Sequence, residues 1–307
     1  MKAILYQRYG GPEVLETAEM PQPQPKANEL QVRVHAASVS IGSVIMRSGR
    51  HPDSAFFSFM IKLIGGWPKP RKKILGYEFS GVVTAVGGRV KGYQVGDEVY
   101  GTTTGLAQGA YADYVCVPEK WKQGVVAHKP AALSFEEAAA LPVGAMTALD
   151  LYRHAGLSSG QKVLVYGAAG SVGSAAVQLA KAAGATVTAV CSSSKLGLAK
   201  SCGASQVIDY TQTPLAQFPT DFDLIFDAVG KIPAKELKKL LKPGGKFTSI
   251  RRITAEKPEY LQQLQMLVAA GQFCPQLDRV YERSEIRDAH AYVDAGKKAG
   301  NVVVRMV

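Results

Sequence analysis

The feature that most restricts the fold of this chain is a regular alternation of apolar runs and amphipathic segments from Gln161 onward. The apolar runs, each about four to six residues long, include KVLVYG, TVTAVC and FDLIFDAVG, and the segments between them have helical composition. Strands that alternate with helices form a parallel sheet that helices cover on both faces. The sequence therefore predicts a doubly wound, Rossmann-like α/β domain.

The chain before residue 120 has a different character. Short β-branched segments separated by glycines, such as ELQVRVHAASV and FSGVVTAVG, predict the strands of a compact mixed barrel. The stretch SFEEAAALPVGAMTALDLYRHAGL predicts a helical bridge with Ser134 as its N-cap. The last segment, NVVVRMV, predicts a strand that returns to the first domain.

Composition and charge limit the function classes. A chain of 307 residues with 47% hydrophobic and 20% charged residues is typical of a soluble two-domain protein. The sequence has no apolar run of about 18 residues and no signal-peptide core at its N-terminus, so we expect a cytoplasmic protein without a membrane span. Its four cysteines are scattered, and we expect reduced thiols.

The net charge of +11 comes from 36 basic and 25 acidic residues, and the basic residues form clusters such as KPRKK and KELKKLLKPGGK. No zinc-finger spacing, helix-turn-helix pattern or aromatic-rich basic ribbon accompanies these clusters, so we do not expect nucleic-acid binding. Two interpretations stay open, namely a plain solvated surface and attraction for an anionic cofactor or membrane surface.

A glycine-rich turn follows the strand KVLVY. Gly167, Gly170 and Gly173 open the next helix with the spacing G-x-x-G-x-x-G. Glycines here permit a tight turn and a close approach to a pyrophosphate, whose charge is favoured at a helix N-terminus. The pattern alone is weak evidence, but its place between a strand and a helix favours nucleotide binding over a merely structural turn.

The second strand, TVTAVC, ends in the turn SSSK, Ser192 to Lys195, and the next acidic residue is Asp209. An acidic side chain at this turn would favour NAD, because it accepts hydrogen bonds from the ribose hydroxyls. Hydroxyls and an ammonium group instead suit a 2'-phosphate, so the sequence predicts NADPH as the cofactor. A solvated lysine at a helix start is the alternative reading of Lys195.

The order of further motifs resembles the medium-chain dehydrogenase/reductase superfamily, specifically its zinc-free quinone oxidoreductase branch. These motifs are LGYEFSGVVTAVGGRVKGYQVGDEVYG, GAYADYV, AAALPVGAMTAL, GAAGSVGSAAVQLAKAAGA and AHAYVDAGKKAGNVVV. The resemblance covers nearly the whole chain. It implies a GroES-like β-barrel catalytic domain over residues 1–120, completed by residues 275–307, and a Rossmann NADP-binding domain over residues 121–274.

The resemblance also implies roles for single residues. Backbone contacts to the pyrophosphate would come from Ser171 and Val172, and the 2'-phosphate would be surrounded by Ser192, Lys195 and Tyr210. Three further residues would lie near the nicotinamide end: Thr147, Val229 and Asn301.

The chain departs from zinc-dependent relatives. It has no cysteine in the loop SVSIGSV and has Tyr77 where those relatives place a histidine, so we expect no metal ion. An alcohol dehydrogenase mechanism, which needs a Lewis acid, is therefore disfavoured. The zinc-free branch often carries Asn and Asp in the same loop, and Ser40 and Ser43 are the substrate-contact candidates here. Tyr77, with a reference pKa of about 10, either donates a hydrogen bond to substrate or fills space.

Two other segments leave alternatives open. After GGKFTSI the chain lacks a strand-bearing segment that commonly completes the sheet edge where subunits pair, so a homodimer stays an open alternative.

The segment SAFFSFMIKLIGGW has apolar residues at helical spacing. This stripe is interpreted as packed core, as the wall of an apolar substrate pocket, or as a peripheral membrane contact beside KPRKK.

Without a metal, a reduced nicotinamide delivers hydride to a quinone or to the β-carbon of an α,β-unsaturated carbonyl compound. The protein supplies orientation, exclusion of water and a hydrogen bond to the developing oxyanion. We therefore expect an NADPH-dependent quinone or enone reductase. The alternative is an NADPH-binding structural or regulatory homologue with little or no catalysis, motivated by Ser40, Ser43 and the shortened sheet.

Overall fold

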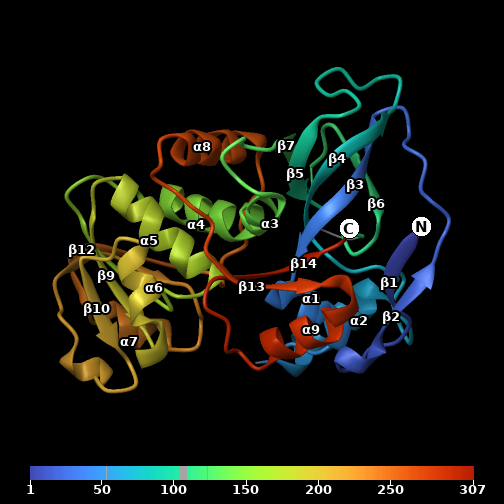
Figure 1. The fold of residues 1–307 in the computed structure, drawn as a ribbon. Helices are drawn as coiled ribbons and strands as arrows, with labels where there is room; N and C mark the ends of the chain where they lie inside the picture. Colours follow the sequence, from blue (N-terminus) through green and yellow to red (C-terminus); the bar gives the residue numbers. More distant parts are fainter. Residues whose placement is uncertain (53, 104–108, 123) are drawn as a thin grey trace. The chain divides into compact units, whose positions relative to one another are not determined.

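The structure, a computed structural model, describes residues 1–52, 54–103, 109–122 and 124–307 (Figure 1). The chain folds into two compact units, of which the first comprises residues 1–142 and 277–307 and the second residues 143–276. Within the described residues, no helix combines the length and the apolar character that crossing a bilayer requires.

The first unit is built on a seven-stranded sheet with the order β13-β14-β3-β4-β5-β7, in which β6 also pairs with β3. The C-terminal strand β14 pairs antiparallel with β3, which confirms the predicted return of the chain to the first unit. A two-stranded sheet of β1 and β2 stands beside it. The strands are β1 (Lys2–Tyr6), β2 (Leu15–Glu19), β3 (Glu29–Ser38), β4 (Glu78–Val86), β5 (Glu98–Thr102), β6 (Tyr114–Pro118), β7 (Val126–His128), β13 (Leu277–Glu282) and β14 (Asn301–Arg305).

The core of the first unit follows from the alternation of apolar residues along β3. Leu30, Val32 and Val34 are fully buried and pack with other apolar side chains of the sheet and of α9. The helical segments of this unit are η1 (Pro12–Val14), α1 (Ile41–Ser48), α2 (Ala55–Gly65), α3 (Phe135–Ala140), η4 (Arg283–Glu285) and α9 (Ile286–Asp294).

The predicted bridge is two helices instead of one. Helix α3 begins at the expected N-cap, where the Ser134 hydroxyl and the Glu137 side chain form a capping box. The chain turns at Leu141, and α4 (Pro142–Ala155) begins at a proline, which has no N–H to continue the hydrogen bonds of α3. Helix α3 contacts β3 and β4 and belongs to the first unit, whereas the second unit begins at Val143.

The second unit contains a five-stranded parallel sheet with the order β10-β9-β8-β11-β12. Val163, Leu164 and Val165 of the central strand are fully buried, as expected for a sheet covered on both faces. The strands are β8 (Lys162–Tyr166), β9 (Thr186–Cys191), β10 (Gln206–Asp209), β11 (Phe222–Asp227) and β12 (Leu241–Ser249). The helical segments after α4 are α5 (Ser171–Ala182), η2 (Ser193–Lys195), α6 (Leu196–Ser201), η3 (Leu215–Gln217), α7 (Ala234–Lys238) and α8 (Pro258–Ala269).

From β8 the chain adds β9 and β10 toward one edge of the sheet, and then β11 and β12 toward the other edge. The topological switch point therefore lies between β8 and β11. Ligands of open parallel sheets bind outside the carboxyl ends of the strands at such a switch point. A cofactor site is therefore expected at the turns that follow β8 and β11.

Candidate functional site

The glycine turn joins the carboxyl end of β8 to α5. Gly167 has a φ of +81°, in the left-handed region that favours glycine, and a Cβ there would collide with the Val229 side chain. A Cβ on Gly173 would lie 2.9 Å from the Cα atom of Ala168. These two glycines therefore allow the turn to pack closely against the loop after β11 and against its own helix.

Gly170, the third glycine, is the N-cap residue of α5 and has an ordinary φ of −85°. A Cβ there would have only the Gly167 carbonyl oxygen within 4 Å, at 3.9 Å. As a glycine, Gly170 has no side chain that could accept a hydrogen bond from the first turn of the helix, which begins at Ser171. A helix N-terminus whose N-cap has no side chain, with open space where a Cβ of Gly170 would stand, fits the pyrophosphate of a pyridine nucleotide.

Asp227, at the end of β11, fixes the neighbouring loop. Its buried Oδ1 accepts hydrogen bonds from the backbone N–H groups of Val229 at 3.0 Å and Gly230 at 2.8 Å, and its Oδ2 accepts one from the Ser249 hydroxyl at 2.9 Å. Asp227 was not predicted as a site residue, although a carboxylate that ends an apolar strand is a signal visible in the sequence. Through these bonds Asp227 holds Val229 against the glycine turn.

The turn after β9 lies beside the end of β10. Cys191 and Asp209 are paired in the parallel register, and the Tyr210 N–H donates to the Cys191 carbonyl oxygen at 3.2 Å. The Lys195 N–H donates to the carbonyl oxygen of Ser192 at 2.9 Å. The structure therefore brings together the three residues for which the resemblance implies 2'-phosphate contacts.

The same register brings an acidic group to this turn. The Ser193 hydroxyl donates to Oδ2 of Asp209, and the Thr211 hydroxyl and N–H donate to Oδ1 at 2.7 and 2.9 Å. The hydrogen bonds from Ser193 and then Thr211 lower the pKa of the Asp209 carboxyl. The sequence suggested that no carboxylate lies at the turn, because Asp209 is distant along the chain. This inference is wrong, since the parallel pairing of β10 with β9 places Asp209 next to the turn.

Thr147 and Asn301 lie on different units. A Cβ on Gly144 of α4 would lie 3.2 Å from the Ser171 carbonyl group, so α4 closely approaches the start of α5. Thr147, three residues after Gly144, shares that face of α4. Asn301 is buried at the start of β14 in the first unit.

The substrate-contact candidates of the first unit lie near the start of α1. The Ser40 hydroxyl caps α1 by accepting a hydrogen bond from the Ser43 N–H, and the two hydroxyl oxygens are 3.3 Å apart. Ser43 is fully buried. A Cβ on Gly42 would lie 3.5 Å from the Tyr77 ring, so the structure brings Tyr77 to the same place. The roles of these three side chains stay predictions.

Glu78, which follows Tyr77, is a buried carboxylate that the sequence analysis missed. It accepts a hydrogen bond from the Ser38 hydroxyl. The Tyr111 hydroxyl donates to the Ser38 carbonyl oxygen at 3.0 Å, and burial raises the pKa of Tyr111. An acid at the start of the apolar strand EFSGVV was the available signal.

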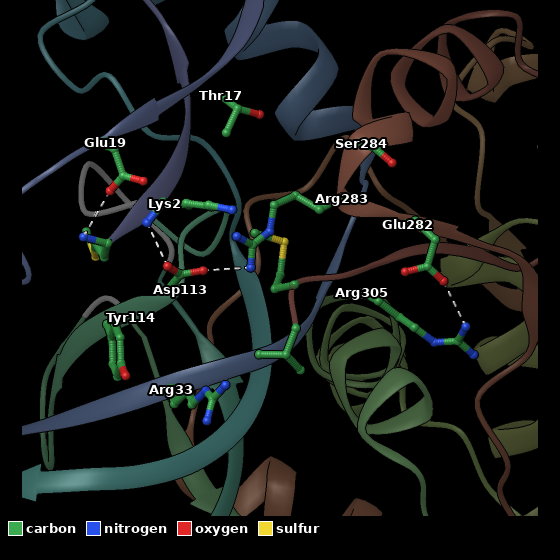
Figure 2. A pocket seen from close by; sticks show the side chains of 13 residues that line it. Lys2, Thr17, Glu19, Arg33, Asp113, Tyr114, Glu282, Arg283, Ser284 and Arg305 are labelled. Atoms are coloured by element: carbon green, nitrogen blue, oxygen red, sulfur yellow. Dashed lines mark hydrogen bonds and ion pairs between the residues drawn. The ribbon is translucent and has the colours of Figure 1, made fainter.

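An open pocket of about 750 Å³ on the first unit lies apart from these candidates (Figure 2). Its charges are largely paired with one another, as between Arg283 and Asp113 at 2.6 Å and between Arg305 and Glu282 at 3.0 Å. None of the predicted site residues lines it. We therefore assign it no role in the chemistry.

The comparisons with known proteins place the chain in a family. Residues 26–130 match the family described as "Alcohol dehydrogenase GroES-like domain", and residues 171–271 match that described as "Zinc-binding dehydrogenase". The whole chain is 34% identical to 2-methylene-furan-3-one reductase of Solanum lycopersicum and covers 79% of that protein. The chain belongs to the medium-chain dehydrogenase/reductase superfamily. This is a family of oxidoreductases that depend on pyridine nucleotides.

Other members of the superfamily are similar over nearly the whole chain. The chain is 31% identical to the NADPH-dependent alkenal/one oxidoreductase, chloroplastic, of Arabidopsis thaliana, over 99% of this chain and 79% of that protein. The crystal structure of Escherichia coli quinone oxidoreductase complexed with NADPH matches with a TM-score of 0.81 and 25% identity, over 99% of this chain and 100% of that chain. The predicted fold class, a GroES-like domain with a Rossmann-like parallel-sheet domain, is confirmed.

The family that residues 171–271 match is described as zinc-binding, whereas the sequence predicts a site without a metal ion. In the part of the chain that the structure describes, no group of three or more His, Cys, Asp and Glu side chains is arranged to hold a metal ion. The expectation of a metal-free site stays a prediction, to be tested by elemental analysis.

Proposed function

We propose that the protein is an NADPH-dependent reductase of quinones or of α,β-unsaturated carbonyl compounds. The observation that carries this proposal is the N-terminus of α5, where the N-cap Gly170 has no side chain and leaves open space in which a Cβ would stand. Relatives named as an alkenal/one oxidoreductase and as a quinone oxidoreductase support this class of acceptor.

The chain's residues would hold the cofactor in two places. The backbone of Ser171 and Val172 would contact the pyrophosphate, and the turn of Ser192 and Lys195, together with Tyr210, would contact the 2'-phosphate. Phosphate groups are favoured there by the helix dipole and by the lysine charge. When bound, the reduced nicotinamide supplies a hydride, near which Thr147, Val229 and Asn301 would lie.

Tyr77 would act on the acceptor. Its hydroxyl would donate a hydrogen bond to the carbonyl oxygen as negative charge develops on that atom, which is the interaction that lowers the barrier most when it is prearranged. Ser40 and Ser43 would bound the acceptor near the start of α1, where the structure brings them close to Tyr77. Exclusion of water around these groups would strengthen the hydrogen bond.

A panel of acceptors tests the proposed function. Purified protein is mixed with NADPH or NADH and with quinones, enones or enals, and oxidation of the cofactor is followed. Turnover of any acceptor with NADPH supports the reductase. Tight NADPH binding without turnover of any acceptor would instead establish the alternative, a cofactor-binding homologue without catalysis.

The metal prediction has its own test. Protein that has been dialysed against a chelator should retain full activity, because the proposed chemistry uses Tyr77 where a Lewis acid would otherwise stand. Elemental analysis is expected to find no stoichiometric zinc. About one zinc ion per chain that resists dialysis would overturn the metal-free site.

We further propose that the protein acts in the cytoplasm. None of the four cysteines, all of which lie in the described part of the chain, forms a disulfide bond, and Cys274 is exposed, which is typical of a reducing compartment. Fractionation of cells that express the tagged chain tests this location. Recovery in an organelle, the kind of location that the name of the chloroplastic relative gives for that protein, would contradict it.

A further inference from the structure

Helix α2 turns its apolar side chains to solvent. Phe56 is 67% exposed, Phe59 61% and Leu63 52%. At about 100° per residue, the helix positions from Phe59 round to Phe57 span an arc of about 160° that contains only apolar side chains. The reading of this stripe as packed core is therefore wrong for most of its members, since the exposed ones are Phe56, Phe57, Phe59, Leu63, Ile64 and Trp67.

The opposite side of α2 packs on the protein through polar groups. The Ser58 hydroxyl donates to the Ser54 carbonyl oxygen at 2.8 Å and accepts a hydrogen bond from the His51 N–H at 2.8 Å. The Lys62 ammonium group lies 5.8 Å from the centre of the Tyr9 ring. An ordinary surface helix buries its apolar side, so α2 has the reverse orientation.

Hydrogen bonds hold the basic segment KPRKK, residues 69–73, at the C-terminal end of α2. The Arg71 N–H donates to the Gly65 carbonyl oxygen at 2.7 Å, and the Tyr9 hydroxyl donates to that of Gly66 at 2.8 Å. These bonds hold the exposed cations of KPRKK beside the apolar side chains. The α2 surface, as we call it, consists of the six exposed apolar side chains named above together with the exposed cations Lys69, Arg71, Lys72 and Lys73.

We propose that the α2 surface docks on an anionic lipid bilayer. An exposed apolar helix side sinks into the boundary between headgroups and acyl chains, and neighbouring lysine and arginine side chains contact anionic headgroups. From Ser54 to Tyr77 the sequence has five basic residues and no acidic one, so its charge complements that of an anionic membrane. Trp67 at the edge has the side chain that is enriched at membrane interfaces.

The same charge disfavours the other apolar partner, a second copy of the chain. A two-fold interface presents the same surface from both subunits. The four exposed cations of one α2 surface would then face those of the other, and facing like charges are destabilising. The proposal rests on the first unit alone and does not depend on cofactor binding or on the acceptor.

Co-sedimentation with vesicles tests the charge contribution. The full chain should bind vesicles that mix phosphatidylcholine with phosphatidylglycerol, bind phosphatidylcholine vesicles much more weakly, and lose affinity as salt is raised. Replacing Lys72 and Lys73 together by alanine should weaken binding to the mixed vesicles about 25-fold, about fivefold for each cation. The matched control replaces Lys231 and Lys235, exposed lysines of the second unit, by alanine and should leave binding unchanged.

A second pair of variants tests the apolar contribution. Replacing Phe59 and Leu63 together by serine should weaken vesicle binding at least tenfold, because their apolar surface no longer leaves water on binding. The melting temperature should stay the same, since both side chains are already exposed in the free protein. The control Met266→Ser, at an exposed methionine of α8, should bind as the unchanged protein does.

Three results would overturn the proposal. The first is wild-type protein that stays in the supernatant with the mixed vesicles. The second is self-association without lipid that the variant with serine at positions 59 and 63 abolishes, which would make the α2 surface a subunit interface. The third is unchanged vesicle binding by that variant with a raised KM for a water-soluble acceptor, which would make the stripe a wall of the substrate pocket.

Discussion

The Ser193 hydroxyl donates a hydrogen bond to the Asp209 carboxylate and so joins the turns that follow β9 and β10. This contact puts a negative charge beside the turn that we propose for the 2'-phosphate. Lys195, two residues after Ser193, provides the opposite charge from within that turn. Cofactor preference is therefore expected to reflect the balance of these two groups.

Asp209→Asn should shift this balance toward NADPH. Asparagine keeps an oxygen that accepts the Ser193 hydrogen bond but removes the negative charge, and a solvent-screened repulsion of this kind corresponds to about a fivefold change in affinity. Titration with both cofactors should show the ratio of NADPH to NADH affinity rising by that factor. An unchanged ratio would mean that the Asp209 carboxylate is too far from the 2'-phosphate to repel it.

Lys195→Ala should act in the opposite direction. Loss of one charge-assisted hydrogen bond should weaken NADPH by about tenfold to 150-fold and leave NADH, which lacks the phosphate, nearly unaffected. The matched control is Lys200→Ala, on the helix α6 that follows directly, which should change neither affinity. If the wild-type protein binds NADH as tightly as NADPH, the assignment of this turn is wrong.

Two glycine substitutions separate folding from cofactor binding. Gly170→Ala adds a methyl group in open space, so the melting temperature should change little, whereas NADPH and NADH should both weaken on the order of tenfold because the methyl group crowds the pyrophosphate. Gly173→Ala instead forces a methyl group against the Ala168 backbone and should lower the melting temperature. Undiminished binding of both cofactors by the Gly170→Ala variant would show that the pyrophosphate does not bind at this turn.

Tyr77→Phe tests the proposed donor. Loss of a hydrogen bond to a developing oxyanion should lower kcat for enones by about tenfold to a few hundredfold. The kcat for quinones should fall less, because quinones are already strongly electrophilic. The control Tyr9→Phe removes a hydroxyl that bonds the Gly66 carbonyl oxygen and should leave kcat unchanged. If the Tyr77→Phe variant has the same kcat as the wild type for every enone, the Tyr77 side chain only fills space.

His290 should make the stability of the first unit depend on pH. The side chain is fully buried, and within the described residues neither ring nitrogen has a hydrogen-bond partner. Burial, and then the charge of Arg47, lowers the pKa of His290 to about 3. An imidazole in the unfolded chain titrates near 6.5, so between these values the unfolded chain binds more protons and the native state loses stability as the pH falls.

The expected loss is about 2 kcal/mol between pH 7 and pH 5. His290→Phe keeps a ring beside Tyr111, with which His290 makes an edge contact, and removes this proton uptake. Denaturant unfolding at the two pH values should therefore show a smaller loss of stability for the variant. Equal losses for variant and wild type would show that His290 does not control the pH dependence.

The parts of the fold that could be predicted depend on residues close together in the sequence. Apolar runs alternating with amphipathic segments set the parallel sheet, Ser134 and its following glutamates set the start of α3, and the β-branched tail sets β14. The glycine turn was likewise found because its spacing lies within one loop. The break between α3 and α4 was missed, although Pro142 was a local signal for it.

The rest depended on which distant residues meet. Asp209 reaches Ser193 only through the register of β10 on β9, and Glu78 was hidden because its burial depends on the packing around β4. The α2 stripe shows the same limit, because apolar residues at helical spacing do not tell whether that side of the helix faces the core or solvent. The exposure of Phe56 and Phe59 became known only from the structure.

Acceptor-dependent oxidation of NADPH, measured side by side for wild type and Gly170→Ala, tests the central claim most directly. We predict that the wild type oxidises NADPH only when a quinone or an enone is present. The variant should need about tenfold more NADPH to reach the same rate, in step with its weaker binding. Wild-type protein that binds NADPH but oxidises none of it with any quinone or enone would contradict the claim.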